Sequence, residues 1–143
     1  MRKRASVLFV AVALLALGVL RTADANPSLG ATLTGAAETG GGDADGSGDV
    51  LISLSPGGNS MCFRIRVSGI AAPTAANIYK APAGVDGSVV MTLTTAGIGG
   101  EAIDCLPLDP KLLKDLMQHP EEYYVNVLNA EYPDGAVRGQ LSR

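Results

Sequence analysis

The chain has 143 residues, of which 47% are hydrophobic and 17% are charged, and its formal net charge is −3. This length is enough for one domain of ordinary size with a buried core. The acidic balance and the scattered positions of the few cations exclude nucleic acid and anionic lipid surfaces as partners.

Residues 1–25 have the pattern of a secretory signal peptide. Three basic residues at positions 2–4 precede an uncharged apolar run from position 5 to 20, and Ala23-Asp24-Ala25 follows as a small-x-small cleavage site. The run has 16 residues, which is short of the roughly 20 that a membrane-spanning helix needs. We therefore expect cleavage after Ala25, no stable membrane insertion, and a single secreted domain formed by residues 26–143.

Removal of this segment makes the chain more acidic. Residues 1–25 carry four basic residues and one acidic residue, so the rest has 7 Lys and Arg against 13 Asp and Glu, a formal charge of −6. This balance gives further reason to exclude nucleic acid as a partner.

The remainder of the chain reads as short strands separated by Gly, Pro and Asp turns. Alternation of apolar and polar residues over 61–68 predicts a strand with one buried face and one solvated face. Further strands are predicted at 29–36, 50–55, 77–79 and 89–93, with polar or Gly-rich loops at 38–49 and 95–104. A closing hairpin is predicted with arms at 123–126 and 136–141, around a turn at Pro133-Asp134-Gly135.

One helix is expected near 110–118. Asp109 can cap its start, Pro110 suits its first position, and Pro120 ends it. Leu112, Leu113, Leu116 and Met117 fall on one side at helical spacing. With seven or so strands, the pattern predicts an all-β fold, an antiparallel Greek-key sandwich or flattened barrel with one short helix.

The two cysteines, Cys62 and Cys105, lie 43 positions apart. Export to an oxidising compartment favours a disulfide between them, which would stabilise the fold by about 4 kcal/mol in the loop-entropy model. Two free thiols or a metal pair are the alternative. Because Cys62 lies on the polar side of its strand pattern, we expect a bridge to face solvent and to tether the segment before the helix.

Three groups of residues were weighed as sites. His119 is the only histidine, so a histidine-rich metal site or a Ser-His-Asp relay with a spare ligand is not available, and a helix-end or solvated role is favoured. Asp43, Asp45 and Asp49 are spaced loosely like a calcium loop. The twelfth position from Asp43 is a leucine rather than a bidentate acid, so a polar loop is favoured and weak calcium binding is the alternative.

Glu121 and Glu122 are adjacent in a segment taken as extended. Their side chains should therefore point in opposite directions and not form a catalytic carboxylate pair.

The loop 79–88 is the predicted partner-facing surface, with Tyr79, Lys80 and Asp86 as contact residues. We expect the two charges to be solvated. The alternative is that Tyr79 packs as an ordinary strand residue and that the glycines of the loop serve only the turn.

Five segments together resemble the CHRD domain, the module repeated in chordin and found alone in many secreted bacterial proteins. They are ATLTGA at 31–36, VSGI at 67–70, PTAANI at 73–78, AGVDGSVV at 83–90 and the closing hairpin at 123–141. The resemblance implies a sandwich of superoxide dismutase-like or immunoglobulin-like architecture. It also implies a His-x-His pair, which is replaced here by Asn77 and Tyr79, and these are poor ligands for copper or zinc.

The sequence contains no residue set that identifies a reaction or a cofactor. We therefore expect a secreted, non-catalytic CHRD-domain protein, a binding or structural module at the cell surface or in the extracellular space. Its expected partner is an unidentified extracellular protein or glycan. The alternative is a metal-binding module for calcium or, less favoured because of Asn77 and Tyr79, for copper and zinc.

Overall fold

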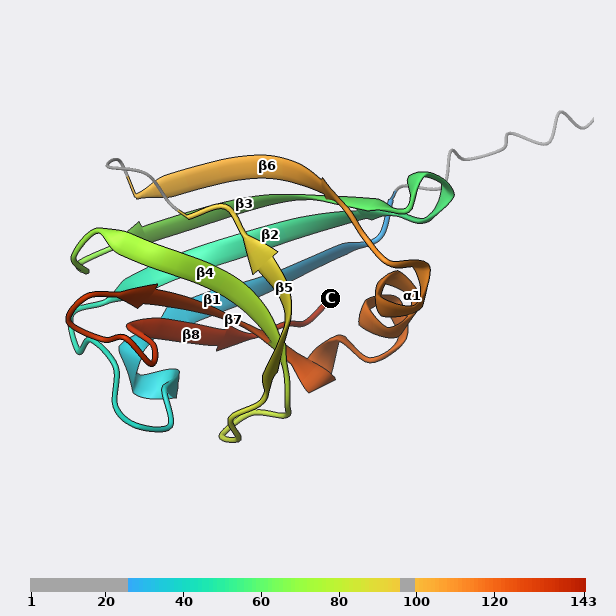
Figure 1. Cartoon of the computed structure of the whole chain (residues 1–143). Helices are drawn as coiled ribbons and strands as arrows, with labels where there is room; N and C mark the ends of the chain where they lie inside the picture. Colours follow the sequence, from blue (N-terminus) through green and yellow to red (C-terminus); the bar gives the residue numbers. More distant parts are fainter. Residues whose placement is uncertain (1–25, 96–99) are drawn as a thin grey trace, which may run out of the picture.

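A computed structural model describes residues 26–95 and 100–143, which form a strongly curled antiparallel sheet with one short helix (Figure 1). The expected signal peptide lies outside the described residues, as do residues 96–99 of the loop predicted at 95–104.

The described residues contain eight strands. They are β1 (Ser28–Thr34), β2 (Ser47–Ser55), β3 (Ser60–Ser68), β4 (Pro73–Lys80), β5 (Ser88–Leu93), β6 (Glu101–Pro107), β7 (Tyr123–Asn129) and β8 (Val137–Gln140). The helix α1 (Pro110–Gln118) lies between β6 and β7. Short 3-10 turns, named η1 to η3, occupy Gly35–Ala37, Pro56–Gly58 and Pro120–Glu122.

The strands form one sheet in the order β5-β4-β7-β8-β1-β2-β3-β6, and every pairing is antiparallel. The two halves meet where β1 and β8 pair at Thr34 and Arg138, and the sheet curls so that the halves face each other (Figure 1). The chain changes halves from β3 to β4, from β5 to β6 and from β6 to β7, which gives the crossed connections of a Greek key. The predicted antiparallel flattened barrel is confirmed.

The core fills the space between the two halves, and strand alternation decides which side chains enter it. In β3, Met61, Phe63 and Ile65 are buried, while Cys62 and Arg66 are exposed on the other side, as predicted. The same alternation in β7 and β8 directs the valines inward and leaves polar and aromatic side chains on the outer face. That outer face carries the candidate site.

The predicted helix is confirmed with its cap. The Asp109 carboxylate accepts hydrogen bonds from the backbone N–H groups of Lys111 (2.9 Å) and Leu112 (3.2 Å). Leu113 and Leu116 are buried in the core, and α1 lies where β6 ends and β7 begins (Figure 1). Among the described helices, none has the length and apolar character needed to cross a bilayer.

Three loop and strand predictions were wrong. Residues 101–104, predicted as irregular, begin β6, which pairs with β3 from Glu101 opposite Arg66 to Pro107 opposite Ser60. The strand β2 starts at Ser47 within the predicted 38–49 loop, where the close approach of the Arg66 carbonyl leaves room only for Gly48. The strand β4 is longer than 77–79 because it is paired on both sides, with β5 and with β7.

Cys62 and Cys105 form a disulfide between directly opposed residues of β3 and β6, with their Cα atoms 4.0 Å apart. Both residues are exposed on the outer face of their half of the sheet. The bridge therefore faces solvent and tethers the strand that precedes α1, as predicted, and the alternatives of free thiols and a metal pair are excluded.

Candidate functional site

The outer face of β4, β7 and β8 carries two cross-strand rows of aromatic and polar side chains. Tyr79, Tyr124 and Gln140 are directly opposed in one row, and Asn77, Asn126 and Arg138 are opposed in the next. These side chains alternate with core residues, so they point away from the hydrophobic interior.

Three loops surround this face and enclose a cleft of about 500 Å³. Residues 38–41 come from the β1–β2 connection, Asp86 and Gly87 from the β4–β5 connection, and residues 131–135 from the β7–β8 connection. The floor includes Tyr79, Tyr124, Asn126 and Leu128. The site is therefore assembled from segments that are far apart in the sequence.

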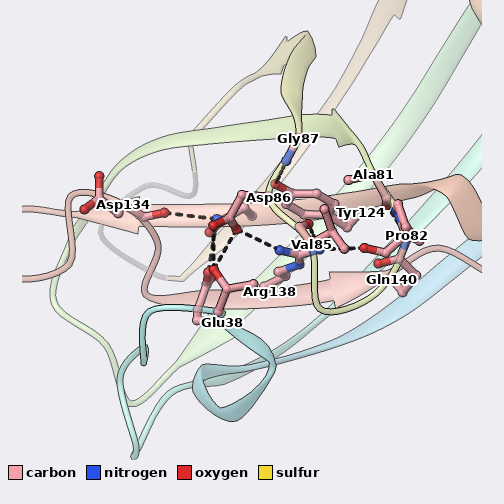
Figure 2. Close-up of polar contacts among 12 residues, drawn as sticks. Glu38, Ala81, Pro82, Val85, Asp86, Gly87, Tyr124, Asp134, Arg138 and Gln140 are labelled. Atoms are coloured by element: carbon pink, nitrogen blue, oxygen red, sulfur yellow. Dashed lines mark hydrogen bonds and ion pairs between the residues drawn. The ribbon is translucent and has the colours of Figure 1, made fainter.

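Arg138 is the buried charge at the centre of this face, with its side chain only 2% exposed. Its guanidinium lies 3.4 Å from the centroid of the Tyr124 ring, donates to Asp86 Oδ1 (3.2 Å), and donates to the carbonyls of Pro82 (3.2 Å) and Val85 (2.7 Å) (Figure 2). A guanidinium supplies several donors in a fixed plane, which suits it to this combination of carboxylate, carbonyls and ring. Arg138 thereby fastens the β4–β5 loop to the sheet.

Other side chains hold the same loop. The Tyr124 hydroxyl accepts a hydrogen bond from Gly87 N (3.1 Å), and Gln140 Nε2 donates to the carbonyl of Ala81 (2.8 Å) (Figure 2). Thr39 donates to the Asp86 carboxylate at 2.7 Å, which links the β1–β2 loop to the β4–β5 loop. The walls of the cleft are thus joined to the sheet and to each other.

Glu38 lies where the β1–β2 loop meets the β7–β8 loop. Asn126 Nδ2 donates to Glu38 Oε2 (3.3 Å) and to the carbonyl of Asp134 (3.2 Å). Burial raises the pKa of Glu38 to about 7, even though the positive charge of Arg138 acts in the opposite direction. Glu38 Oε1 and Asn126 Oδ1 are buried without a hydrogen-bond partner among the described protein atoms.

Gly135 makes this close approach of two loops feasible. Its φ is 147°, and a Cβ at this position would lie 2.5 Å from both carboxylate oxygens of Glu38. The predicted Pro-Asp-Gly turn therefore serves the packing of the site as well as the reversal of the chain.

The structure brings two of the three predicted contact residues to the cleft. Tyr79 is half-buried and stacks on Tyr124, with ring centroids 4.9 Å apart and planes at 4°. Asp86 lies on the rim, where its side chain is 73% exposed although it pairs with Arg138. Both residues line the cleft, and their contact with a partner stays a prediction.

Lys80 does not line the cleft. It forms ion pairs with Asp115 and Glu122 and lies 5.1 Å from the centroid of the Tyr123 ring, so it joins β4 to α1 and the start of β7. The hydrogen bond to Asp115 holds the pKa of Lys80 above its ordinary value. The charged groups of Lys80 and Asp86 are solvent-exposed, as expected, with side chains 44% and 73% exposed, and each is also ion-paired.

The remaining candidates lie elsewhere. His119 is the C-cap of α1, with a half-exposed side chain 3.7 Å from Glu121, in agreement with a helix-end role. Glu121 and Glu122 lie in a 3-10 turn rather than an extended segment. Their side chains have different partners, since Glu122 pairs with Lys80 and Glu121 lies near His119.

The three Asp residues of the suspected calcium loop do not all lie in one loop. Asp43 Oδ1 accepts from the backbone N–H of Asp45 (3.1 Å), which closes a turn, whereas Asp49 belongs to β2 opposite Arg66. Weak calcium binding there stays an untested alternative.

The comparison with protein families matches the CHRD domain over residues 29–141. The chain belongs to the CHRD domain family. The match extends from β1 to the residue after β8 and so includes the whole sheet, α1 and the three loops of the cleft. A comparison with curated proteins gives no match.

The residues at this face do not fit the copper or zinc site that the CHRD resemblance suggests. Asn77 and Tyr79 occupy the His-x-His positions, and Asn77 Nδ2 donates to the Tyr79 hydroxyl (3.3 Å). Within residues 26–95 and 100–143, no three His, Cys, Asp or Glu side chains are grouped to hold a metal. The fixed guanidinium of Arg138 on the same face would also repel a metal cation.

Sequence reasoning missed Glu38, which lines the cleft, and Arg138, which is buried beneath its loops. The alternation of side chains along β8 could have placed Arg138 on the outer face of the sheet. It gives no sign that loops cover this outer face. Glu38 sits in a Gly- and Asp-rich segment that looks like an ordinary polar loop. Only the three-dimensional meeting of the loops gives these residues their burial.

Proposed function

We propose that this CHRD-domain protein is an exported, non-catalytic binding module that holds an extracellular protein or glycan in the cleft over β4, β7 and β8. Export is supported by the signal-peptide pattern of residues 1–25 and by the Cys62–Cys105 disulfide, which oxidising compartments favour.

The observation that carries the proposal is the construction of the cleft. Its floor is part of a sheet, its walls are three loops, and buried polar contacts fix the loops in place. Ligands bind preferentially in concave sites of this kind, where loops are positioned by a rigid scaffold. A site with fixed walls loses less conformational entropy when it binds a ligand.

A binding role fits the chemistry of the floor better than a reaction does. Two groups of a kind that can take part in catalysis are engaged with the protein itself. Arg138 bonds to Asp86 and two carbonyls, and the Tyr124 hydroxyl bonds to Gly87. These contacts hold the walls of the cleft in place. In this proposal they shape a recognition surface.

The proposal is tested by measuring the binding of purified, fluorescently labelled protein to intact cells that produce it. Tyr132 lines the cleft, and its hydrogen bonds within the β7–β8 loop are made by its backbone atoms, so Tyr132→Ala should keep the fold. We expect this variant to bind at least about fivefold more weakly, because aromatic side chains dominate many interfaces.

Ile103→Ala is the matched control. Ile103 is 69% exposed on β6, outside the residues that line the cleft, and the change should leave binding unaltered. Equal binding of both variants and the parent protein would exclude the cleft as the contact site.

A further inference from the structure

We propose that the cleft recognises a cationic group, of the kind presented by a lysine side chain of a protein partner. This inference rests on the proposed binding function and names the chemistry of its ligand.

The charge of the cleft is the first reason. Four carboxylates line it, from Glu38, Asp86, Glu131 and Asp134, and the lining includes no Lys, Arg or His. The nearby cation Arg138 is buried and already has a carboxylate, two carbonyls and an aromatic ring as partners. Its charge offsets part of the acidic surface, and three of its N–H donors are already bonded to Asp86, Pro82 and Val85.

The hydrogen-bonding state of the floor is the second and independent reason. Asn126 is only 4% exposed, and its Nδ2 donates to two acceptors while its Oδ1 has no partner. Glu38 Oε1 is likewise buried and unpartnered. The unmet groups of the described cleft are therefore acceptors, and the ligand that complements them is a donor.

An ammonium group satisfies this pattern better than a sugar hydroxyl. It carries three donors and no acceptor, whereas a hydroxyl brings acceptor lone pairs that would need donors of their own. Tyr132 adds an aromatic ring at the rim, and such rings attract cations. A flexible, narrow lysine stem also suits a cleft walled by three loops.

Access to the deepest acceptors requires a small movement. Glu38 Oε1 and Asn126 Oδ1 are covered by neighbouring protein atoms, so a ligand reaches them when side chains such as Glu38 re-orient while the loop backbones keep their place. Gly40 and Gly41 of the same lining segment have no atoms within 4 Å of the position of an added Cβ, so there is open space for this adjustment.

The Glu38 carboxyl gives the proposal a distinctive pH dependence. It faces Arg138 from β8, Asp86 from the β4–β5 loop and Asn126 from β7, with Glu131 and Asp134 in the neighbouring loop. With a pKa of about 7, Glu38 is roughly one-tenth ionised at pH 6 and nine-tenths ionised at pH 8. A cation favours the ionised form, so its binding should strengthen as the pH rises and should release protons.

The test is an NMR titration of the purified protein with acetyl-Gly-Lys-Gly-amide at pH 6 and pH 8. The control ligands are the same peptide acetylated at the lysine Nε and the neutral sugar chitotriose. We expect shifts at the cleft residues with the lysine peptide, tighter binding at pH 8 by up to about tenfold, and loss of binding with the acetylated peptide.

Two variants make the test specific. Glu38→Gln should weaken binding at pH 8 and abolish its pH dependence, whereas Glu121→Gln removes a 69% exposed carboxylate outside the cleft and should change neither. Shifts of the cleft with chitotriose but not with the lysine peptide would overturn the inference and leave the proposed binding function standing.

Two other results would overturn the inference. One is lysine-peptide binding that is unaffected by Glu38→Gln, and the other is the absence of any shift at the cleft. The cell-binding assay with Tyr132→Ala would then judge the proposed function separately.

Discussion

Arg138 shows how one buried side chain organises the loops above the outer face of β4, β7 and β8. The alternation of side chains in β8 places Arg138 on the outer face of the sheet. Its partners are the carbonyls of two loop residues and the Asp86 carboxylate, which forms no ion pair with another described cation. A buried guanidinium of this kind is tolerated because it is paired with the Asp86 carboxylate and bonded to the carbonyls of Pro82 and Val85. Loss of Arg138 should therefore release the β4–β5 loop.

Replacement of Arg138 by methionine keeps the apolar stem and removes the donors. We expect the free energy of unfolding to fall by about 2–4 kcal/mol, because the Val85 carbonyl loses its side-chain donor and the Pro82 carbonyl keeps only the Val85 N–H, while Asp86 remains solvated. The measurement is urea denaturation of both proteins. Arg66→Met is the control, since its exposed ion pair with Glu101 should contribute only about 0–1 kcal/mol, and equal losses for the two variants would disprove the organising role of Arg138.

Glu38 should make stability depend on pH in an unusual direction. Its pKa is raised in the folded protein from 4.5 to about 7, so the folded chain binds more protons than the unfolded chain between these values. Stability from this group is therefore present below pH 4.5 and is lost as the pH rises through 7. Discounted for the partial exposure of the carboxyl, the effect is roughly 1–2 kcal/mol.

The variant Glu38→Gln isolates this contribution. We expect it to be more stable than the parent protein by roughly 1–2 kcal/mol at pH 8 and nearly equal to it at pH 4, because glutamine remains neutral at both values. Urea denaturation at the two pH values provides the measurement. A variant that is less stable at pH 8 would show that the ionised carboxylate stabilises the loop contact instead.

At the scale of elements, the disulfide has a defined task because β6 is an edge strand. Among the strands that the structure describes, it pairs only with β3, and the Cys62–Cys105 bridge lies within that pairing, just ahead of α1. Edge strands have half the hydrogen-bonded neighbours of central strands. A covalent link at this position therefore compensates for the missing neighbour.

Removal of the bridge by the double substitution Cys62→Ser and Cys105→Ser should cost roughly 2–5 kcal/mol. We expect the largest increase in amide hydrogen exchange in β6 and the smallest in β7 and β8, which lie in the other half of the sheet. Uniform loss of protection across the sheet would argue against a local role of the disulfide. An intact mass that corresponds to two free thiols in the exported protein would show that the disulfide does not form.

The elements that sequence reasoning predicted well are those with local signals. Asp109 and Pro110 define the start of α1 within two residues, and the Pro-Asp-Gly turn defines the closing hairpin. The strand β6 was missed because Gly residues precede it, only Ala102 of its side chains is buried, and its partner β3 is distant in sequence. The cleft was missed for the same physical reason, since Glu38 and Asn126 meet across 88 positions.

At the scale of the whole molecule, the two halves of the sheet have different outer faces. The face of β2, β3 and β6 carries the disulfide, the Arg66–Glu101 ion pair and the exposed Leu51 and Ile103. The face of β4, β7 and β8 is covered by three loops with a buried guanidinium beneath them. In the proposed function, recognition belongs to the face of β4, β7 and β8, and the disulfide stabilises the opposite face.

Site-specific photo-crosslinking distinguishes the two faces. A photoreactive phenylalanine analogue placed at Tyr132, on the rim of the cleft, should yield a defined crosslinked product on intact producing cells. The same analogue placed at Ile103, on the exposed face of β6, should give little or none. Equal yields at the two positions, or a product formed only at Ile103, would place the partner outside the cleft and refute the binding role proposed for it.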